Sequence, residues 1–195
     1  MYSRIKNQPY LALIFLVITL ASCAYGPQFI SLNPDIVIIN REEAPSTSIS
    51  LNVTDSRSDK TLGVNGDDNA QFDISLKGDV KAILNAKIVA AFEKRRIQTV
   101  NEDSSPTKLL IDLQRLTLNS IKSPRFGYVT TLDVEIVASI LNGNKKYSKR
   151  YTVGTEKKLG RVSSSHESAQ MVNEAMSQAL SSIVNDDALL RALDQ

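Results

Sequence analysis

The sequence predicts an α+β domain, with an antiparallel sheet of about five strands and two main helices packed on one face. Residues 48–53 and 128–141 alternate between apolar and other side chains with a period of two. Residues 75–96, and those from about 165 onward, instead repeat apolar side chains at helical spacing. The predicted order is β-β-α-β-β-β-α, without an internal repeat. Helices on one face of an antiparallel sheet are the economical arrangement for that order.

The first two strands are predicted from short β-branched or alternating runs. Ile36–Ile39 is a β-branched run and predicts the first strand. In 48–53, the side chains of Ile49, Leu51 and Val53 share one face. The stretch 55–73 is rich in glycine, aspartate and asparagine, which predicts an irregular loop.

Capping residues set the limits of the predicted helices. Ser75 is a plausible N-cap for the helix over 75–96, and Lys94-Arg95-Arg96 places positive charge at its negative end. That basic cluster could be a binding patch, but its position at a helix end favours a structural role. Ser164-Ser-His-Glu167 fits a capping box at the start of the second helix, and a short last helix is predicted over 186–193.

Three strands are predicted between the helices. In 109–118 the alternation slips between Leu113 and Leu116, which predicts a β-bulge or a strand leaving the core. The segment 128–141 has one apolar and one wetter face, which predicts a sheet covered on one side. Asn142-Gly143 is the preferred dipeptide of a type I′ hairpin, and 146–153 is the return strand.

The N-terminus has the features of a secretory signal. Its only charges before residue 23 are those of Arg4 and Lys6, and the strongly apolar run 11–20 follows them. A retained transmembrane anchor is the weaker interpretation, because this run is short and Gly26-Pro27 follow soon after. Residues 1–22 are therefore predicted to be removed as a signal peptide.

The four residues Leu20-Ala21-Ser22-Cys23 resemble the lipobox of bacterial lipoproteins. That resemblance implies an S-diacylglycerol group on Cys23, cleavage before it, and an N-acyl chain such as palmitate on the new amine. Several acyl chains anchor a protein stably where one does so marginally. Ala24, rather than aspartate, follows the cysteine, which in a Gram-negative cell implies the outer membrane, facing the periplasm. A buried structural cysteine is the other interpretation, and an intramolecular disulfide is excluded because no second cysteine exists.

The mature chain is formally neutral. Removing residues 1–22 from the 195 leaves 173, and it takes two of the 23 basic residues, so that 21 face 21 acidic ones. Composition therefore offers no electrostatic case for nucleic-acid binding. Residues 23–28 are the lipidated N-terminus and a tether shorter than about 20 Å when extended. Residues 29–195 suit one periplasmic α+β domain.

The sequence contains no motif typical of catalysis or of a cofactor site. His166 adjoins Ser163, Ser164 and Ser165, but a helix cap explains these serines better than a Ser–His couple. One histidine and one lipidated cysteine provide no zinc or iron set, and no Walker or dinucleotide pattern is present. We therefore expect no metal and no cofactor. Calcium binding at 65–69 is conceivable, but a solvated turn suits that segment better.

One polar cluster follows the second predicted strand. Asp55, Arg57 and Asp59 would point to the same side of an extended chain. A guanidinium between two carboxylates can fix a loop through bidentate pairs. It could instead present Arg57 to an anionic ligand, such as a lipid phosphate or a wall carboxylate. We favour the structural role.

The run from Ile49 through Asp55-Ser-Arg-Ser-Asp59 to Gly63 resembles YajG-type lipoproteins. The similarity continues through the first helix, the 128–141 strand, the 142–145 turn and the final helix. It implies a small outer-membrane lipoprotein of the cell envelope. No established activity of that family can be carried over to this chain.

These observations predict a non-enzymatic, membrane-anchored protein that binds another envelope component, most simply a protein, through an open sheet face or strand edge. The alternative is an accessory protein holding a lipid or a cell-wall fragment between helices and sheet. It requires a cavity lined by residues such as Leu84, Phe92, Leu132 and Ile136, with Arg57 or another cation at its mouth. An enzyme would need converging carboxylates, such as Asp112 with Asp133 or Glu135. The oligomeric state is left open by the sequence.

Overall fold

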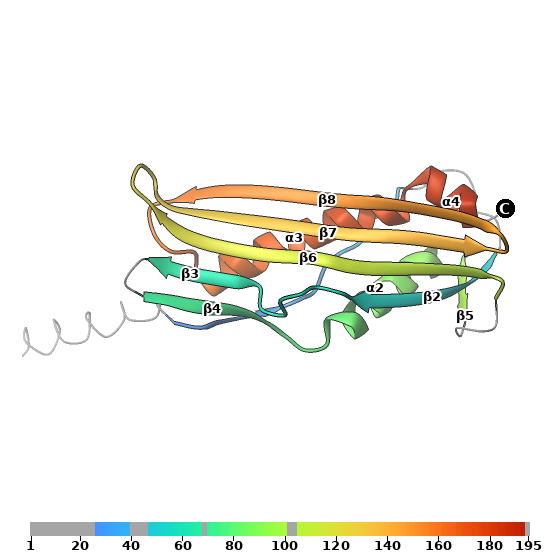
Figure 1. Ribbon diagram of the computed structural model, residues 1–195, viewed down its shortest axis with the longest axis horizontal. Helices are drawn as coiled ribbons and strands as arrows, with labels where there is room; N and C mark the ends of the chain where they lie inside the picture. Colours follow the sequence, from blue (N-terminus) through green and yellow to red (C-terminus); the bar gives the residue numbers. More distant parts are fainter. Residues whose placement is uncertain (1–25, 40–46, 68–69, 101–104, 194–195) are drawn as a thin grey trace, which may run out of the picture.

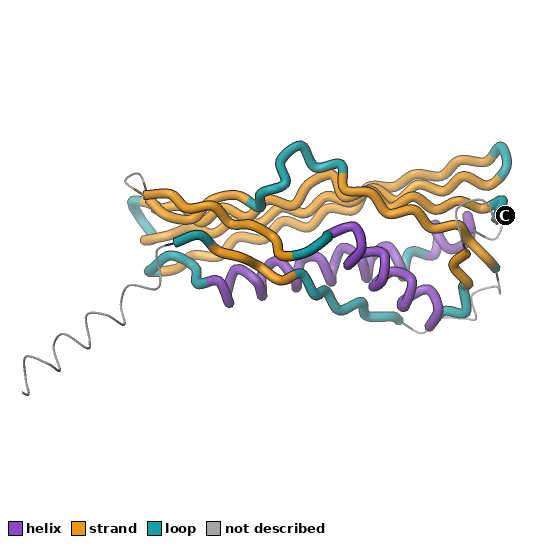
Figure 2. The backbone as a smooth tube through the Cα atoms, turned by 90° about the horizontal axis from the view of Figure 1, so that it is seen from below, coloured by secondary structure: helices purple, strands orange, loops and turns teal. Residues whose placement is uncertain are grey.

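The structure, a computed structural model, describes residues 26–39, 47–67, 70–100 and 105–193. Eight strands form one mixed sheet, and the described helices all lie on one of its faces (Figures 1 and 2). The predicted α+β class and the one-sided helix layer are confirmed. The purely antiparallel sheet of about five strands is wrong, because four of the strand pairs are parallel.

Three long strands form an antiparallel meander: β6 (Thr107–Ser123), β7 (Gly127–Asn142) and β8 (Lys145–Leu159). At about 3.3 Å per residue, a strand as long as β7 spans about 50 Å, so the domain is elongated. The predicted irregularity in β6 is confirmed as a register shift between Leu113 and Arg115. This shift keeps both halves of β6 facing the core in spite of the phase change in the sequence.

The core lies between the meander and the helices. Alternate side chains of β7 from Leu132 to Ile140 are almost fully buried, which confirms that one face of the sheet is covered. Two helices, α2 (Val80–Lys94) and α3 (Ser165–Val184), turn their apolar stripes toward that face. Each fully buried aliphatic side chain contributes about 1.5–3 kcal/mol to folding.

Shorter strands complete the sheet beside β6 (Figure 1). Two of them, β2 (Ser48–Asp55) and β3 (Gly63–Asp67), pair in parallel with successive parts of β6. Strand β4 (Ala70–Lys77) returns antiparallel to β3, while β1 (Gln28–Ser31) and β5 (Gln98–Val100) pair in parallel with β4 and β2. The parallel pairs bring together segments that are far apart in the chain, so local alternation could not predict them.

Two boundary predictions are wrong, one because of strand pairing and one because of a different helix cap. The stretch 55–73 contains β3 and the start of β4, whose pairing compensates for its low apolar content. Ser75 lies within β4, and the N-cap of α2 is Asp79, whose carboxylate accepts a hydrogen bond from the backbone N–H of Ala82. A short polar N-cap later in the sequence thus starts the helix.

The hairpin between β7 and β8 is confirmed, but its turn type is not. Asn142 pairs with Lys145, which leaves Gly143-Asn144 as the two-residue loop. Gly143 has a φ of +58°, whereas Asn144 is not among the residues with positive φ. This is the type II′ pattern, with glycine first, and not type I′ with Asn142-Gly143 at its centre.

The predicted first strand, Ile36–Ile39, does not join the sheet. Residues 33–39 instead run as an extended strap along the outer side of α3 (Figure 2). Every second backbone N–H of the strap donates to a polar side chain of α3 or its C-cap, with N···O distances of 2.5–2.9 Å. The pairs are Asn33 with Asn173, Asp35 with Ser177, Val37 with Ser181 and Ile39 with Asn185. Two strand residues advance about as far as four helix residues, so the two repeats match.

The start of α3 and the short last helix agree with the sequence prediction. Ser164 and Glu167 form the expected capping box at the start of α3, and α4 (Asp187–Leu193) is the short last helix. Arg95, from the basic cluster at the end of α2, is buried and donates to the carbonyl of Ile39 and to Asn185. It therefore ties α2, the strap and α3 together.

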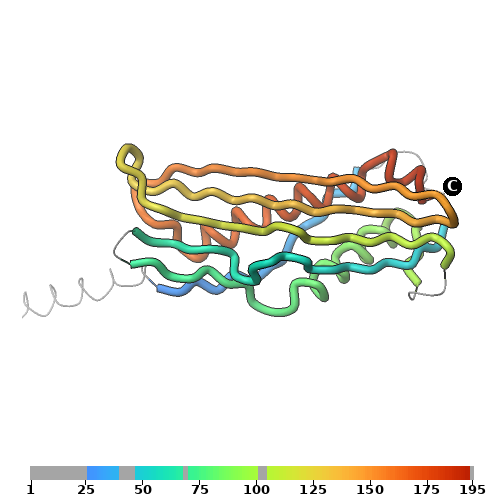
Figure 3. The backbone as a smooth tube through the Cα atoms, viewed as in Figure 1, coloured from blue at the N-terminus to red at the C-terminus, as the bar shows by residue number. Residues whose placement is uncertain are grey.

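The two ends of the elongated domain are different. We call the end that holds the start of β1, the β3–β4 junction and the β6–β7 turn the near end. We call the end that holds the β7–β8 turn and α4 the far end (Figures 1 and 3). The strap carries the chain from the near end toward the far end.

Candidate functional site

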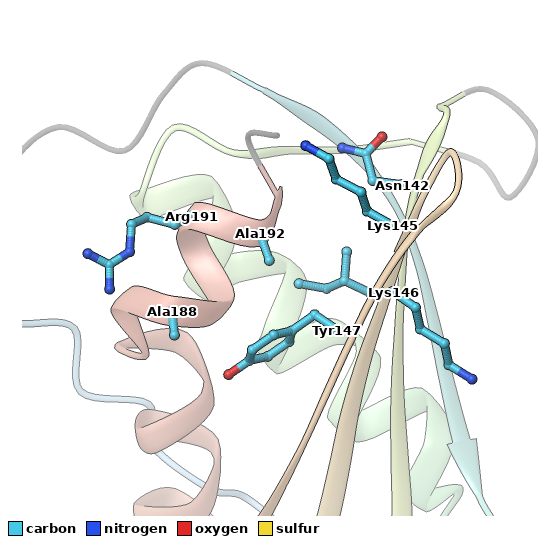
Figure 4. Close-up of a pocket in the computed structure, with 8 residues that line it drawn as sticks. Asn142, Lys145, Lys146, Tyr147, Ala188, Arg191 and Ala192 are labelled. Carbon is cyan, nitrogen blue, oxygen red and sulfur yellow. The ribbon is translucent and has the colours of Figure 1, made fainter.

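A hollow lies at the far end between the β7–β8 hairpin and α4. It encloses about 450 Å³, with Ile140, Tyr147, Ala188 and Ala192 among its lining residues. Figure 4 shows Lys145 and Arg191 on opposite sides of this far-end hollow, while the side chain of Lys146 points away from α4. The hollow exists because the alanine side chains are too small to fill it. The cations around it make it suitable for an anionic group.

The wall of this hollow is held in place by a buried carboxylate. Asp186, between α3 and α4, accepts hydrogen bonds from Lys149 Nζ at 2.5 Å and from the Tyr151 hydroxyl at 2.7 Å. Burial alone would raise the pKa of Asp186, but these bonds and two backbone N–H groups outweigh it and lower the pKa. Burial raises the pKa of Tyr151, and its bond to Asp186 raises it further. Asp186 thus remains ionised and fixes α4 against β8.

A second hollow lies on the open face of the sheet, across the same hairpin. It encloses about 630 Å³ and shares Ile140 and Lys146 with the far-end hollow. Leu110 and Leu141 contribute its apolar surface and are 38% and 48% exposed. Lys108 and Lys146 line it as well. An apolar floor beside cations suits an amphipathic anion.

Strand β8 is an edge of the sheet. Among the described strands it pairs only with β7, so the backbone groups on its other side are not used within the sheet. The strand carries one acidic residue, Glu156, and six basic ones: Lys145, Lys146, Lys149, Arg150, Lys157 and Lys158. A long basic edge resists pairing with a copy of itself and favours an acidic strand.

Only two members of the predicted Asp55–Arg57–Asp59 cluster come together. Arg57 is buried, with an exposure of only 6%. Its guanidinium donates two hydrogen bonds to the carboxylate of Asp55, at 2.8 and 2.9 Å. These bonds hold the pKa of Asp55 at about 2. Asp59 instead accepts from the backbone and hydroxyl of Thr61. The geometry favours a clamp that fixes the loop after β2.

Two of the three carboxylates predicted for an enzyme, Asp112 and Glu135, are engaged by neighbouring side chains, while Asp133 is exposed on β7. Asp112 accepts from the Thr54 hydroxyl at 2.7 Å and from Gln114 at 3.1 Å. Burial raises its pKa, but these hydrogen bonds and those from Ser56 outweigh burial and lower it. Glu135 lies between Arg150 at 3.2 Å and Arg115 at 3.8 Å. The lowered pKa of Asp112 is the opposite of what a general acid requires.

The serines beside His166 have structural partners. Ser163 is fully buried, with its hydroxyl 2.7 Å from that of Thr130, and Ser164 caps α3. Within the described ranges, no group of three or more histidine, cysteine or acidic residues is placed to bind a metal ion. Cys23 lies outside the described residues.

The polar stripe of α3 that binds the strap was not among the sequence predictions. Asn173, Ser177, Ser181 and Asn185 recur at intervals of four residues beside the apolar stripe. That regular spacing is the signal that could have revealed it.

The described residues thus define an elongated α+β domain with hollows at one end and a basic, unpaired sheet edge. The chain matches the uncharacterised lipoprotein family over residues 34–194, and it belongs to that family. The description of the family names no enzymatic activity. In the part of the chain that the structure describes, no helix is long and apolar enough to cross a membrane.

Two solved structures share the fold. One is protein XCC0632 from Xanthomonas campestris, of family DUF330, with a TM-score of 0.57 and 17% identity; the match covers 85% of this chain and 98% of that one. Another, an uncharacterised protein, has a TM-score of 0.52 and 6% identity over 80% of this chain and 97% of that one. No curated protein matches the sequence. At these identities the likeness extends to the fold alone.

Proposed function

We propose that this lipoprotein is anchored through Cys23 in the outer membrane, faces the periplasm, and binds another envelope protein without catalysis. Its membership of a lipoprotein family and the lipobox support the anchor. Only four residues separate Cys23 from the start of β1, so the anchor holds the near end close to the membrane. The far end then projects about 50 Å into the periplasm.

The observation that carries the proposal is the unpaired basic edge of β8, which begins at the far end beside both hollows. An extended acidic segment of a partner can add to such an edge through backbone hydrogen bonds. Its carboxylates would meet Lys145 and Lys146, and a side chain could enter the far-end hollow beside Arg191. Electrostatic complementarity of this kind selects the partner and speeds association.

The test is affinity capture from envelope membranes with the lipidated full chain. Exchanging Lys145 and Lys146 for glutamate (K145E/K146E) should abolish recovery of a defined partner. The matched control, K81E/K94E, makes the same charge change at exposed positions of α2 and should leave recovery intact. Recovery that is equal for both variants, or lost in both, would overturn the assignment of the surface.

A second candidate function is the binding of an amphipathic anion, such as a lipid or a wall fragment. The cavity expected between helices and sheet is not the place for it, because Leu84, Phe92, Leu132 and Ile136 are at most 1% exposed within the core. The open-face hollow, with Leu110 and Leu141 beside two lysines, supports this candidate instead. Stabilisation of the full chain by palmitate, lost in Leu141→Asp but kept in Phe29→Asp, an exposed apolar position outside the hollow, would favour it.

A further inference from the structure

The β6–β7 turn at the near end carries exposed apolar and basic side chains together. Ile121 and Phe126 are 50% and 49% exposed, and Lys122 and Arg125 between them are exposed as well. Lys158, at the end of β8, lies over the Phe126 ring with its Nζ 4.4 Å from the centroid. We refer to these five residues as the near-end patch. Large apolar side chains gathered on a surface commonly mark a contact site.

Strand pairing places this patch at the end of the domain where the tether begins. Ile121 pairs with Gly66 of β3, which pairs with Gln71 of β4, and β4 pairs with β1 from Gln28 onward. The same neighbourhood is visible in Figures 1 and 3. Cys23 precedes Gln28 by five residues, which reach at most about 18 Å. The patch and the anchor site therefore belong to the same end.

The charge around the turn is positive. Glu156, the acidic residue of β8, is paired with Lys158 at 3.5 Å. On the neighbouring start of α3, Glu167 is paired with Arg161 at 2.8 Å. Asp67 ends β3 one residue after Gly66, which pairs with Ile121, and is an acidic neighbour of the turn, whereas Asp73 lies farther along β4, opposite Val64. The basic residues around the turn are Lys122, Arg125, Lys157 and Lys158.

We propose that the near-end patch rests on the anionic phospholipid surface of the membrane that holds the anchor. The inference builds on the proposed lipid anchor. Ile121 and Phe126 have the size and exposure to enter the headgroup region, and Lys122 and Arg125 lie beside them to meet lipid phosphates. The short tether keeps the patch at high local concentration, so weak contacts suffice to orient the domain. The basic far end then points away from the membrane.

The experiment uses the lipidated full chain in phosphatidylcholine vesicles with and without phosphatidylglycerol. Because the sulfur of Cys23 is committed to lipid, one new cysteine can be labelled alone. A fluorophore at Ser123→Cys reports on the near-end turn, and one at Asn144→Cys reports on the far-end turn. Lipids with brominated acyl chains quench only a probe that touches the bilayer.

We expect quenching at position 123, increased by phosphatidylglycerol, and none at 144. Exchanging Lys122 and Arg125 for glutamine should lower the ratio of docked to undocked domain about fivefold per cation removed. The control, Lys81→Gln with Lys94→Gln on α2, should change nothing. Quenching that is equal at the two ends, or independent of both anionic lipid and these cations, would overturn the proposal. Vesicle flotation reports the anchor separately, so failure of the anchor is distinguished from failure of the patch.

Discussion

The strap is held by side chains of α3 and its C-cap, so two substitutions in α3 should change the free energy of opening the strap by a predictable amount. Ser177→Ala and Ser181→Ala together remove the acceptors of the Asp35 and Val37 amides, at N···O distances of 2.8 and 2.9 Å. A hydrogen bond contributes about 1 kcal/mol net, so the free energy of opening the strap should fall by about 2 kcal/mol. Alanine also raises helix propensity, but α3 stays folded when the strap opens, so that gain cancels.

Native-state hydrogen exchange measures this opening directly. A fall of about 2 kcal/mol corresponds to exchange about 30-fold faster at the Asp35 and Val37 amides. Global unfolding should change less, because the propensity gain of two alanines offsets part of the loss.

The control is Ser182→Ala, one position along the same helix. The hydroxyl of Ser182 donates to the carbonyl of Gln178 and to no strap residue among those described. It should leave the exchange of both strap amides unchanged. If the strap amides of the double variant exchanged at the same rate as those of Ser182→Ala, the hydrogen bonds to Ser177 and Ser181 would not be what holds the strap.

Three further substitutions test the structural contacts. Arg57→Met should lower the free energy of unfolding by at most about 2 kcal/mol at neutral pH. Because the pKa of Asp55 is lowered to about 2 in the folded state, this stabilisation is present above about pH 4 and is lost as the pH falls toward 2. The urea unfolding curves of variant and parent should therefore converge near pH 2. Ser164→Ala removes the N-cap of α3 and should cost about 1 kcal/mol in the same assay, with a melting temperature below that of the parent. Gly127→Ala should destabilise by about 1–2 kcal/mol, because its φ is +80° and a Cβ would lie 2.9 Å from the Leu159 carbonyl oxygen; Gly160→Ala, with open space around it, should be neutral.

Local patterns predicted the elements that carry their own signals. The burial of β7, the bulge in β6 and the capping box at Ser164 depend on side chains close together in the chain, and each is confirmed. The stripe of α2 is also confirmed, although Asp79 replaces Ser75 as its cap. In each case the residues that decide the structure lie within a few positions of one another.

Non-local pairing accounts for what the sequence could not reveal. Ile36–Ile39 has strand propensity, but its backbone bonds go to α3 because the polar stripe offers acceptors at matching intervals. Within 55–73, Gly63 has a φ of +141° and approaches the carbonyl of Leu118 too closely for a side chain. Such strand glycines look like loop residues until their partner strand is known.

The candidate site was predicted in outline only. An open sheet face and a free edge were expected, but the hollows depend on where α4 packs against the hairpin. That position is set by the contacts of Lys149 and Tyr151 with Asp186, which are 35 or more residues apart in the chain. The spacing of Asp55 and Arg57 predicted their ion pair. Asp59 does not join that pair because its carboxylate accepts hydrogen bonds from Thr61 instead.

Site-specific photocrosslinking in living cells tests the central claim, that the two ends of this lipoprotein have different contacts. One photoreactive residue is placed at Asn144 in the far-end turn and another, in a separate strain, at Ser123 in the near-end turn. We expect a discrete protein adduct from position 144 that K145E/K146E removes, and lipid but no protein adduct from position 123. A discrete protein adduct from 123 with none from 144 would contradict it.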